Sequence, residues 1–539
     1  MHNIGLLDCT LRDGGYVNDW KFGHENLVSI FERLVDAGVD IIEIGFLDER
    51  RPFDIDRSIM PDTESADKIY GLLDKKQAMV VGMIDYGTCG IQNLQPCRES
   101  CLDGIRVIFK KHLMCQAMEF CRQVQVLGYK VFSQLVSITS YSDEELMKLI
   151  GLVNEVKPYA VSMVDTYGLL HPEDLLHYYK ILDEFVDDGI QIGFHAHNNF
   201  QLAYANALAF MEKDSERDIV VDGTLYGMGK SAGNAPLELL GMRLNEKFYK
   251  NYRMEPMLEA IEESILDFFS KAPWGYKMFF YLSGLNKCHP NYVTYFEGKK
   301  NLSVSKINML LEQVKPQEKK LLYDNVIAEA LYEDYLAGEG SDEEDKQKFL
   351  NTIHGKKLLL VGPGKNIQLQ ENIVQKFIIK EEPFIISINY LPCGVDPDCI
   401  FVTNGKRYHD MTLELKKADV KILATSNVEA RCGSFDFVVN RAPLLETEER
   451  IIDNSFLMLV KFLCGLGVKE VFCAGFDGYS DKEDNYCNPA MEYFFVKQEA
   501  SHLNYHMKKR IAEFRNNIEI HFITYSAYDA VEDINGAAI

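Results

Sequence analysis

Two histidines, His195 and His197, lie two residues apart in the apolar segment GFHAHNN. Side chains alternate between the faces of a strand, so both imidazoles point the same way, a spacing suited to two ligands of one metal ion. The segment LLDCTLRDGG places Asp13 beside glycines that let the backbone turn sharply, and Asp13 is the candidate oxygen ligand. This set leaves coordination positions open, which favours catalysis at a divalent cation over a closed structural site. The competing interpretation is that one histidine only hydrogen-bonds a neighbour.

A second ionisable residue interrupts an apolar segment. Glu43 lies in VDIIEIGF, where an unpaired carboxylate would be costly to bury, so it needs a cation or hydrogen-bond donors. Arg12 is the natural candidate for this partner of Glu43. The alternative is that Glu43 faces outward and pairs at a helix interface.

These residues need a scaffold that brings distant segments together. Over residues 1–245, short apolar segments alternate with amphipathic segments of helical length, which is the pattern of repeated strand–helix units. Eight such units in this length predict a (β/α)8 barrel, with Arg12, Asp13 and the histidines at its carboxyl face. A doubly wound open sheet is the competing fold. The eight predicted strands begin near residues 4, 39, 78, 104, 130, 159, 190 and 218.

The rest of the chain divides into three parts. Residues 246–336 carry apolar side chains at helical spacing, including Leu258, Ile261 and Ile265, and predict a helical extension. Residues 337–354 begin with the acidic run AGEGSDEEDK and are expected to be a solvated linker. Residues 355–539 repeat short apolar strands that end in small or polar residues, which predicts a Rossmann-like α/β domain with a ligand site at the strand ends.

The segment KKLLLVGPGKN opens this second domain with a strand and a glycine turn. Free backbone donors around Gly362, Gly364 and Lys365, with Asn389 at the end of the next strand, form a candidate nucleotide loop. The segment lacks the full GxGxxG and GxxxxGK[ST] patterns, so a plain tight turn is the alternative.

Composition excludes several classes of function. The chain of 539 residues has 57 Lys and Arg against 81 Asp and Glu, a net charge of −24 that disfavours nucleic acid and anionic membrane surfaces as partners. No apolar run is long enough to span a membrane. The first residues lack a signal-peptide pattern, and the 13 cysteines are scattered without a CxxC pair, so we expect a cytoplasmic protein with free thiols.

Five motifs in order resemble the DRE-TIM metallolyases, which include hydroxymethylglutaryl-CoA lyase and 4-hydroxy-2-oxovalerate aldolase: LLDCTLRDGG, the Glu43 strand, VDTYG, FHAHNN and DGTLYGMGKSAGNAPLE. The resemblance implies a (β/α)8 barrel that holds Mn²⁺ or Mg²⁺ through Asp13, His195 and His197, with Asn234 as a further ligand or a neighbour of one. It places Arg12 and His195 beside the substrate and gives Arg12 the role of steadying an enolate oxygen. Thr166 falls where the aldolases carry a serine near the substrate, although a strand-end cap is equally open. Homo-oligomers are implied by the resemblance alone.

In the expected reaction, the enzyme makes or breaks a carbon–carbon bond between a small 2-oxo acid, such as pyruvate, and an aldehyde. This chain departs from the aldolases at Tyr16, where they place a histidine, so Tyr16 is the first candidate for the base and His112 and His289 are the others. A Claisen-type synthase using an acyl-CoA is the first alternative. A non-catalytic metal-binding scaffold is the second.

The second domain resembles, through its glycine loop and an Asn-ended strand, the Rossmann-like domains of sialyltransferase-like and flagellar-glycosylation accessory proteins. That resemblance implies binding of a nucleotide or nucleotide sugar and a role in surface-sugar biosynthesis. The alternative is a scaffold domain that only mediates assembly.

Overall fold

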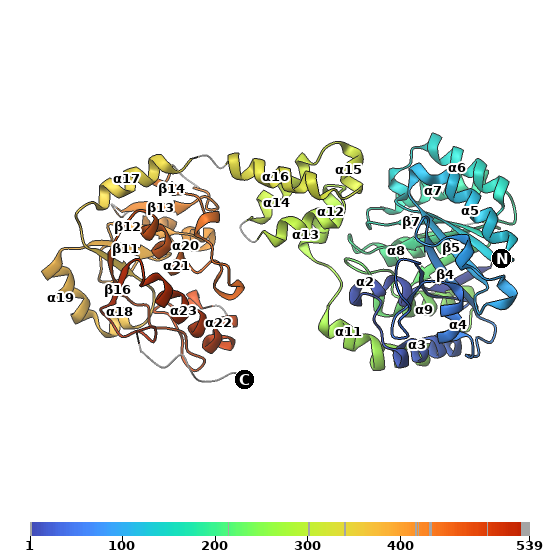
Figure 1. Cartoon of the computed structure of the whole chain (residues 1–539), viewed down its shortest axis with the longest axis horizontal. Coiled ribbons are helices and arrows are strands. Elements are labelled where there is room, and N and C mark those ends of the chain that lie inside the picture. Colours follow the sequence, from blue (N-terminus) through green and yellow to red (C-terminus); the bar gives the residue numbers. More distant parts are fainter. Residues whose placement is uncertain are drawn as a thin grey trace. The chain divides into compact units, whose positions relative to one another are not determined.

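The computed structural model describes residues 3–529 except 214, 300–301, 339–340, 416–417, 419, 431–433 and 493. The chain forms two compact units (Figure 1). The first comprises Met1–Tyr295 and Asn308–Ala328, and the second comprises Phe296–Ile307 and Glu329–Ile539. No helix in the described ranges is both long and apolar enough to cross a bilayer.

The first unit contains the closed barrel. All neighbouring strands are parallel and follow the order β1-β9-β8-β7-β6-β5-β4-β2, and pairing of β1 with β2 closes the ring. All eight predicted strands are present, so the open-sheet alternative is wrong for this half. A short strand that was not predicted, β3 (Ile59–Met60), extends the edge of β2. The barrel strands are β1 (Ile4–Asp8), β2 (Ile41–Leu47), β4 (Met79–Asp85), β5 (Gly104–Phe109), β6 (Lys130–Leu135), β7 (Ala160–Asp165), β8 (Gln191–Ala196) and β9 (Ile219–Gly223).

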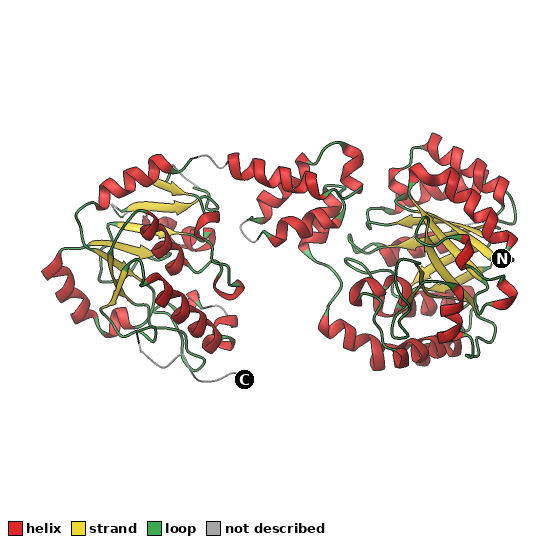
Figure 2. Ribbon diagram, in the orientation of Figure 1, coloured by secondary structure: helices red, strands yellow, loops and turns green. Residues whose placement is uncertain are grey.

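Amphipathic helices surround the strands (Figure 2). In α6 (Asp143–Val156), Ser142 and Glu145 form a reciprocal capping box that fixes the first turn. Buried Leu146, Leu149 and Val153 then recur at helical spacing and face the barrel. The other helices of the ring are α3 (His24–Ala37), α4 (Thr63–Tyr70), α5 (Met114–Val126), α7 (Pro172–Phe185), α8 (Ala203–Met211) and α9 (Leu237–Phe248).

The segment that follows the barrel is mostly helical, and part of it packs over the loops at the carboxyl ends of the strands. Tyr167, just after β7, donates a hydrogen bond from its hydroxyl to Leu321 O at 2.7 Å and contacts the ring of His289. Phe200, after β8, packs against Tyr281. The aromatic side chains of this segment therefore serve packing on the barrel face. Its helices are α10 (Met254–Ala260), a π-helical turn (Ile261–Ile265), α11 (Leu266–Lys271), α12 (Met278–Leu285), α13 (Pro290–Gly298), α14 (Val304–Gln313), α15 (Gln317–Leu321) and α16 (Asn325–Gly338).

The acidic segment predicted as a linker over 337–354 is structured where it is described. Residues Glu343–Ile353 form α17, which buries Phe349 and Ile353 in the core of the second unit. Asp345 accepts a hydrogen bond from Val438 N at 2.9 Å. The prediction of a solvated linker was wrong here because the charged residues lie on one face of a helix whose other face is apolar.

The second unit is an open α/β domain, as predicted. Its sheet is parallel throughout and has the order β14-β13-β12-β11-β10-β15-β16. Chain order reverses between β10 and β15, and this switch point is where open α/β sheets bind ligands. The strands are β10 (Leu358–Val361), β11 (Phe384–Ile388), β12 (Cys399–Val402), β13 (Lys421–Thr425), β14 (Phe437–Val439), β15 (Glu470–Ala474) and β16 (Glu519–Phe522).

Candidate active site

One helical turn after β1 presents the first two functional side chains. Asp8 ends the strand and accepts hydrogen bonds from the backbone and hydroxyl of Thr10, at 3.0 and 2.6 Å. This fixes α1 (Thr10–Asp13), which is wholly buried and directs Arg12 and Asp13 into the carboxyl end of the barrel. The strand end therefore determines where both groups lie.

Asp13, His195 and His197 converge there, as predicted. Asp13 Oδ2 lies 3.5 Å from His195 Nε2 and 3.8 Å from His197 Nε2, and all three residues are buried. These distances are too long for neutral hydrogen bonds but place three ligand atoms around one point. The structure therefore brings the three candidate ligands together, while His195 also hydrogen-bonds a neighbour, Asp222.

Asn234 belongs to the same cluster. Its Nδ2 donates to Asp13 Oδ1 at 2.9 Å and to Met228 O at 3.1 Å, while its buried Oδ1 has no hydrogen-bond partner in the described structure. The close approach requires glycine at 229, because a Cβ there would lie 2.7 Å from Asp13 Oδ1 and still closer to the Asn234 amide. The loop after β9 thus places next to Asp13 an amide whose oxygen is buried without a partner in the described structure.

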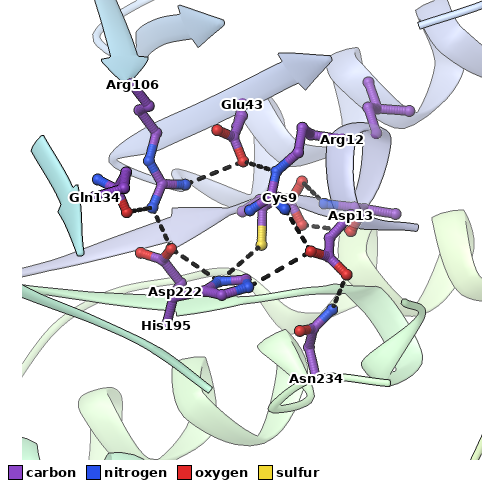
Figure 3. Close-up of polar contacts among 12 residues, drawn as sticks. Cys9, Arg12, Asp13, Glu43, Arg106, Gln134, His195, Asp222 and Asn234 are labelled. Atoms are coloured by element: carbon purple, nitrogen blue, oxygen red, sulfur yellow. Dashed lines mark hydrogen bonds and ion pairs between the residues drawn. The ribbon is translucent and has the colours of Figure 1, made fainter. Parts of the chain in front are cut away.

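Figure 3 shows that these groups are part of a closed ring of polar contacts within the barrel. Arg12 Nε donates to Glu43 Oε2 at 2.7 Å, and Arg106 Nη1 donates to the same oxygen at 3.0 Å. Arg106 also pairs with Asp222, which lies 3.1 Å from His195 Nδ1. The ring closes through Asp13, which contacts both His195 and Arg12. Glu43 therefore faces the barrel interior, and Arg12 is its partner as expected.

Asp222 determines the state of His195. Its carboxylate accepts the Nδ1 hydrogen, which leaves the Nε2 lone pair directed at Asp13. Burial opposes protonation of His195, but the neighbouring carboxylates of Asp13 and Asp222 outweigh it and raise its pKa. Burial lowers the pKa of His197 to about 4, so that imidazole is neutral and ready to act as a ligand.

The residues fit a divalent cation. With His195 neutral, the ring holds two positive charges, Arg12 and Arg106, against three carboxylates, Asp13, Glu43 and Asp222, which leaves one negative charge in a buried site. A divalent cation would offset this charge while His195 stays neutral. Two unpartnered ligand atoms, His195 Nε2 and Asn234 Oδ1, are buried beside it. Nitrogen and oxygen donors of this kind suit Mn²⁺ and Mg²⁺ among other divalent ions.

Arg12 keeps donors for a substrate. Its Nε binds Glu43 and its Nη1 binds Asp13, while Nη2 makes no hydrogen bond within the described part of the chain. Arg12 is 5% exposed, so the guanidinium is held rigidly with both N–H groups of Nη2 unused.

Two of the three candidate bases, Tyr16 and His289, are poor proton acceptors near neutral pH. Burial raises the pKa of Tyr16 to about 12, so its phenol stays protonated and can only donate near neutral pH. Burial lowers the pKa of His289 to about 3, and its Nδ1 accepts a hydrogen bond from Asn291 N at 3.1 Å, which leaves the proton on Nε2. His112 is exposed on a 3₁₀ turn (Lys111–Leu113). The raised pKa of Tyr16 does not support the expectation that it is the base, which stays a prediction.

Thr166 lies outside the ring of polar contacts. Its hydroxyl oxygen accepts a hydrogen bond from Ser137 N at 2.8 Å and so caps the loop after β6. This is the strand-end cap that was one of the two interpretations of its sequence position.

The second unit has a cavity of about 440 Å³ over the carboxyl ends of β10, β11, β12 and β15. Its lining includes Pro363, Gly364 and Asn389 from the predicted loop, three arginines (Arg407, Arg441 and Arg450) and aromatic residues such as Phe456, Phe476 and Tyr528. Arg441 Nε is buried without a hydrogen-bond partner among the described residues.

The predicted phosphate cradle is wrong in its detail. Gly362 N and Gly364 N donate to Ala474 O and Gly475 O, both at 2.8 Å, so these donors are not free. Asp477 Oδ2 accepts from Asn366 N at 2.8 Å, and Lys365 lies 3.7 Å from Glu483. The glycines are needed because a Cβ at either position would lie 2.6 Å from Gly475 O. The two glycines allow the loops after β10 and β15 to approach each other closely. The sequence alone could not distinguish this role from binding of a ligand. Asn389 also binds internally, with Thr403 and Ser455.

Sequence reasoning missed Arg106 and Asp222. Both are charged residues inside apolar strands, in GIRVIF and IVVDG, which is the same signal that pointed to Glu43. Their burial, 0% and 2% exposed, would have been expected from that pattern.

The comparisons with known proteins agree with this geometry. The family model HMGL-like matches residues 3–260, so this part of the chain is an HMGL-like domain. A 4-hydroxy-2-oxovalerate aldolase from Pelotomaculum thermopropionicum is 28% identical over 46% of this chain and 71% of its own length. Another, from Bacillus cereus, is 27% identical over 49% and 76%. A solved N-terminal domain of a Bacteroides vulgatus protein named as an aldolase has a TM-score of 0.47 and 22% identity, covering 56% of this chain and 98% of that one.

Proposed function

We propose that the HMGL-like domain, a carbon–carbon lyase, acts on a small 2-oxo acid, with pyruvate as the nucleophile and an aldehyde as its partner. The observation that carries the proposal is the convergence of Asp13, His195 and His197 at the carboxyl face of the barrel, with Arg12 beside them. The aldolases among its relatives support the reaction type.

The proposed site contains metal ligands, a hydrogen-bond donor to the substrate and residues that position them. Asp13, His195, His197 and Asn234 Oδ1 would hold a divalent cation, Mn²⁺ or Mg²⁺, which polarises the keto carbonyl of the 2-oxo acid as a Lewis acid. Arg12 Nη2 donates to the keto oxygen as negative charge develops there. Glu43 and Arg106 hold Arg12, and Asp222 holds His195, so these three are positioning residues.

In the cleavage direction, a 4-hydroxy-2-oxo acid loses its hydroxyl proton to a base and the bond beside the hydroxyl-bearing carbon breaks. The electron pair of that bond passes to the pyruvate fragment as its enolate, the aldehyde leaves, and a proton returned to the enolate carbon gives pyruvate. Condensation follows the same path in reverse. Tyr16, being protonated, supplies a hydrogen bond rather than the basic group.

The test is exchange of the methyl protons of pyruvate in deuterated water with Mn²⁺, followed by NMR, because exchange needs no knowledge of the aldehyde. We expect exchange by the wild type, loss of it in Asp13→Ala and His195→Ala, and no change in His177→Ala, a matched histidine exposed on α7. A wild type that binds Mn²⁺ without exchanging pyruvate contradicts the proposal. Thiol release from an acyl-CoA in its place would favour the Claisen synthase.

We also propose that the second unit binds a nucleotide or nucleotide sugar in its cavity. The support is the position over the switch point, the arginines that line it and the aromatic walls, which together suit a phosphate joined to a base. Calorimetry of the full chain with CMP, UMP, AMP and GMP tests this, with ribose 5-phosphate as the reference. Arg441→Gln should weaken binding about tenfold or more, and Arg515→Gln, which breaks an exposed pair with Asp529, should not. Ribose 5-phosphate binding as tightly as every nucleotide would contradict it.

A further inference from the structure

Lys230 is a charged residue of the barrel mouth that the proposed mechanism does not use. It lies in the loop after β9 that also carries Asn234, and its backbone N–H donates to Asp13 Oδ1 at 3.3 Å. Its ammonium nitrogen lies 5.4 Å from the centre of the Tyr16 ring.

This ammonium has no carboxylate to pair with. No described Asp or Glu oxygen lies within 4.0 Å of it, and no described group hydrogen-bonds it, whereas Lys111 at the same face of the barrel is paired with Glu145 at 2.9 Å. Burial lowers the pKa of Lys230, against the attraction of Asp13. A half-buried cation without a counter-ion is costly, and an anion supplied by a ligand would remove that cost.

The backbone of Lys230 and the two histidines contact different oxygens of Asp13. Oδ2 contacts Arg12, His195 and His197, while Oδ1 contacts Asn234 and the backbone of Lys230. The 2-oxo acid is held on the Oδ2 side by the proposed mechanism. The ammonium of Lys230 lies over Tyr16, whose ring packs with Trp20 and Phe46. With Arg12 and the metal ligands assigned to the 2-oxo acid, Lys230 is left for the second substrate.

We propose that Lys230 binds an anionic group, a carboxylate or a phosphate, at the end of the aldehyde remote from its carbonyl. The substrate class of the lyase is then an anionic aldehyde, and the aromatic side chains around Tyr16 contact the carbon chain between the two ends. This inference rests on the proposed function of the barrel.

The experiment measures kcat/KM for condensation of pyruvate with acetaldehyde, succinic semialdehyde and glycolaldehyde phosphate, using the full chain and Mn²⁺. We expect the wild type to prefer an anionic aldehyde by at least about tenfold, and the better of the two identifies carboxylate or phosphate as the group. Lys230→Met should lower kcat/KM for that aldehyde by about 10- to 100-fold and leave acetaldehyde within about threefold. Lys230→Arg should recover part of the loss, and the ion-paired control Lys111→Met should change nothing.

Pyruvate proton exchange separates the two hypotheses. Exchange that persists in Lys230→Met, together with loss of the anionic preference, supports the inference. An equal fall of exchange and of condensation with all three aldehydes would show that Lys230 serves pyruvate or the fold, and would overturn it. A wild type that exchanges but prefers acetaldehyde would also overturn it, while absence of exchange in the wild type refutes the proposed function itself.

Discussion

Asp222 should control metal affinity although it is not a ligand. In Asp222→Asn the amide oxygen can still accept from His195 Nδ1 and Arg106, so the shape of the site is kept while one negative charge is lost. Partners of metal-bound histidines typically change affinity by about 10- to 100-fold, or roughly 1.4 to 2.8 kcal/mol. His195 is one of three clustered ligand residues and lies 3.1 Å from Asp222, so we expect a loss within that range.

The assay is competition for Mn²⁺ between the protein and a chromophoric chelator at fixed pH and ionic strength. Asp183→Asn is the matched control, because it removes a carboxylate that pairs with Arg217 away from the metal ligands. Asp13→Ala should abolish binding at the same site. The reasoning is refuted if Asp222→Asn binds Mn²⁺ as the wild type does while Asp13→Ala does not bind it, since Asp222 would then not orient or polarise His195.

Three further predictions concern the same barrel. Tryptophan fluorescence can follow its unfolding, because both tryptophans of the chain, Trp20 and Trp274, lie in the first unit. Arg106→Met leaves Glu43 and Asp222 buried with fewer partners and should lower the free energy of unfolding by about 3–5 kcal/mol in urea titrations; an unchanged midpoint would contradict this. Gly229→Ala should displace Asp13 and Asn234 and weaken Mn²⁺ binding with little change in circular dichroism, and normal affinity would count against the crowding described above. Burial raises the pKa of Asp8 from 3.8 to about 7, so the folded state holds this proton more tightly than the unfolded chain. Its contribution to stability is complete below about pH 4 and is lost as the pH rises to about 7, by up to roughly 4 kcal/mol. Relative to the wild type, Asp8→Asn should therefore gain stability between pH 4.5 and 8, and a difference that does not vary with pH would refute this.

The fold of the barrel half could be predicted because each strand is a short apolar segment of its own. Parallel strands buried on both faces leave that pattern whatever their neighbours are. The helix over 343–353 was not predicted, because the segment contains many charged residues and only two buried apolar ones, Phe349 and Ile353. These two stabilise a helix only when the core of the second unit is present to bury them.

The cluster of Asp13, His195 and His197 could be predicted because the types and spacing of its residues, such as His195 and His197, are typical of metal ligands. The ring of contacts could not, since it depends on which strands become neighbours across the barrel interior. Arg106 reaches Glu43 and Asp222 from strands that are far away in sequence. The prediction of free backbone donors in the glycine loop of the second unit failed for a related reason. A glycine required by a close approach to another backbone segment cannot be distinguished in the sequence from a glycine required by a bound phosphate.

The closed ring of polar contacts also has a consequence for how the chain is made. Its members come from β1 through β9, and the pairing of β1 with β9 and β2 joins the first strand to the last. While a ribosome is still adding the residues before His195, Asp13 has already been made, but His195, His197 and Asn234 have not. The N-terminal segment must therefore wait, with its charges in water, for some 220 residues of synthesis. A chain released before His195 is made lacks the set of candidate metal ligands, so only a completed barrel has that set.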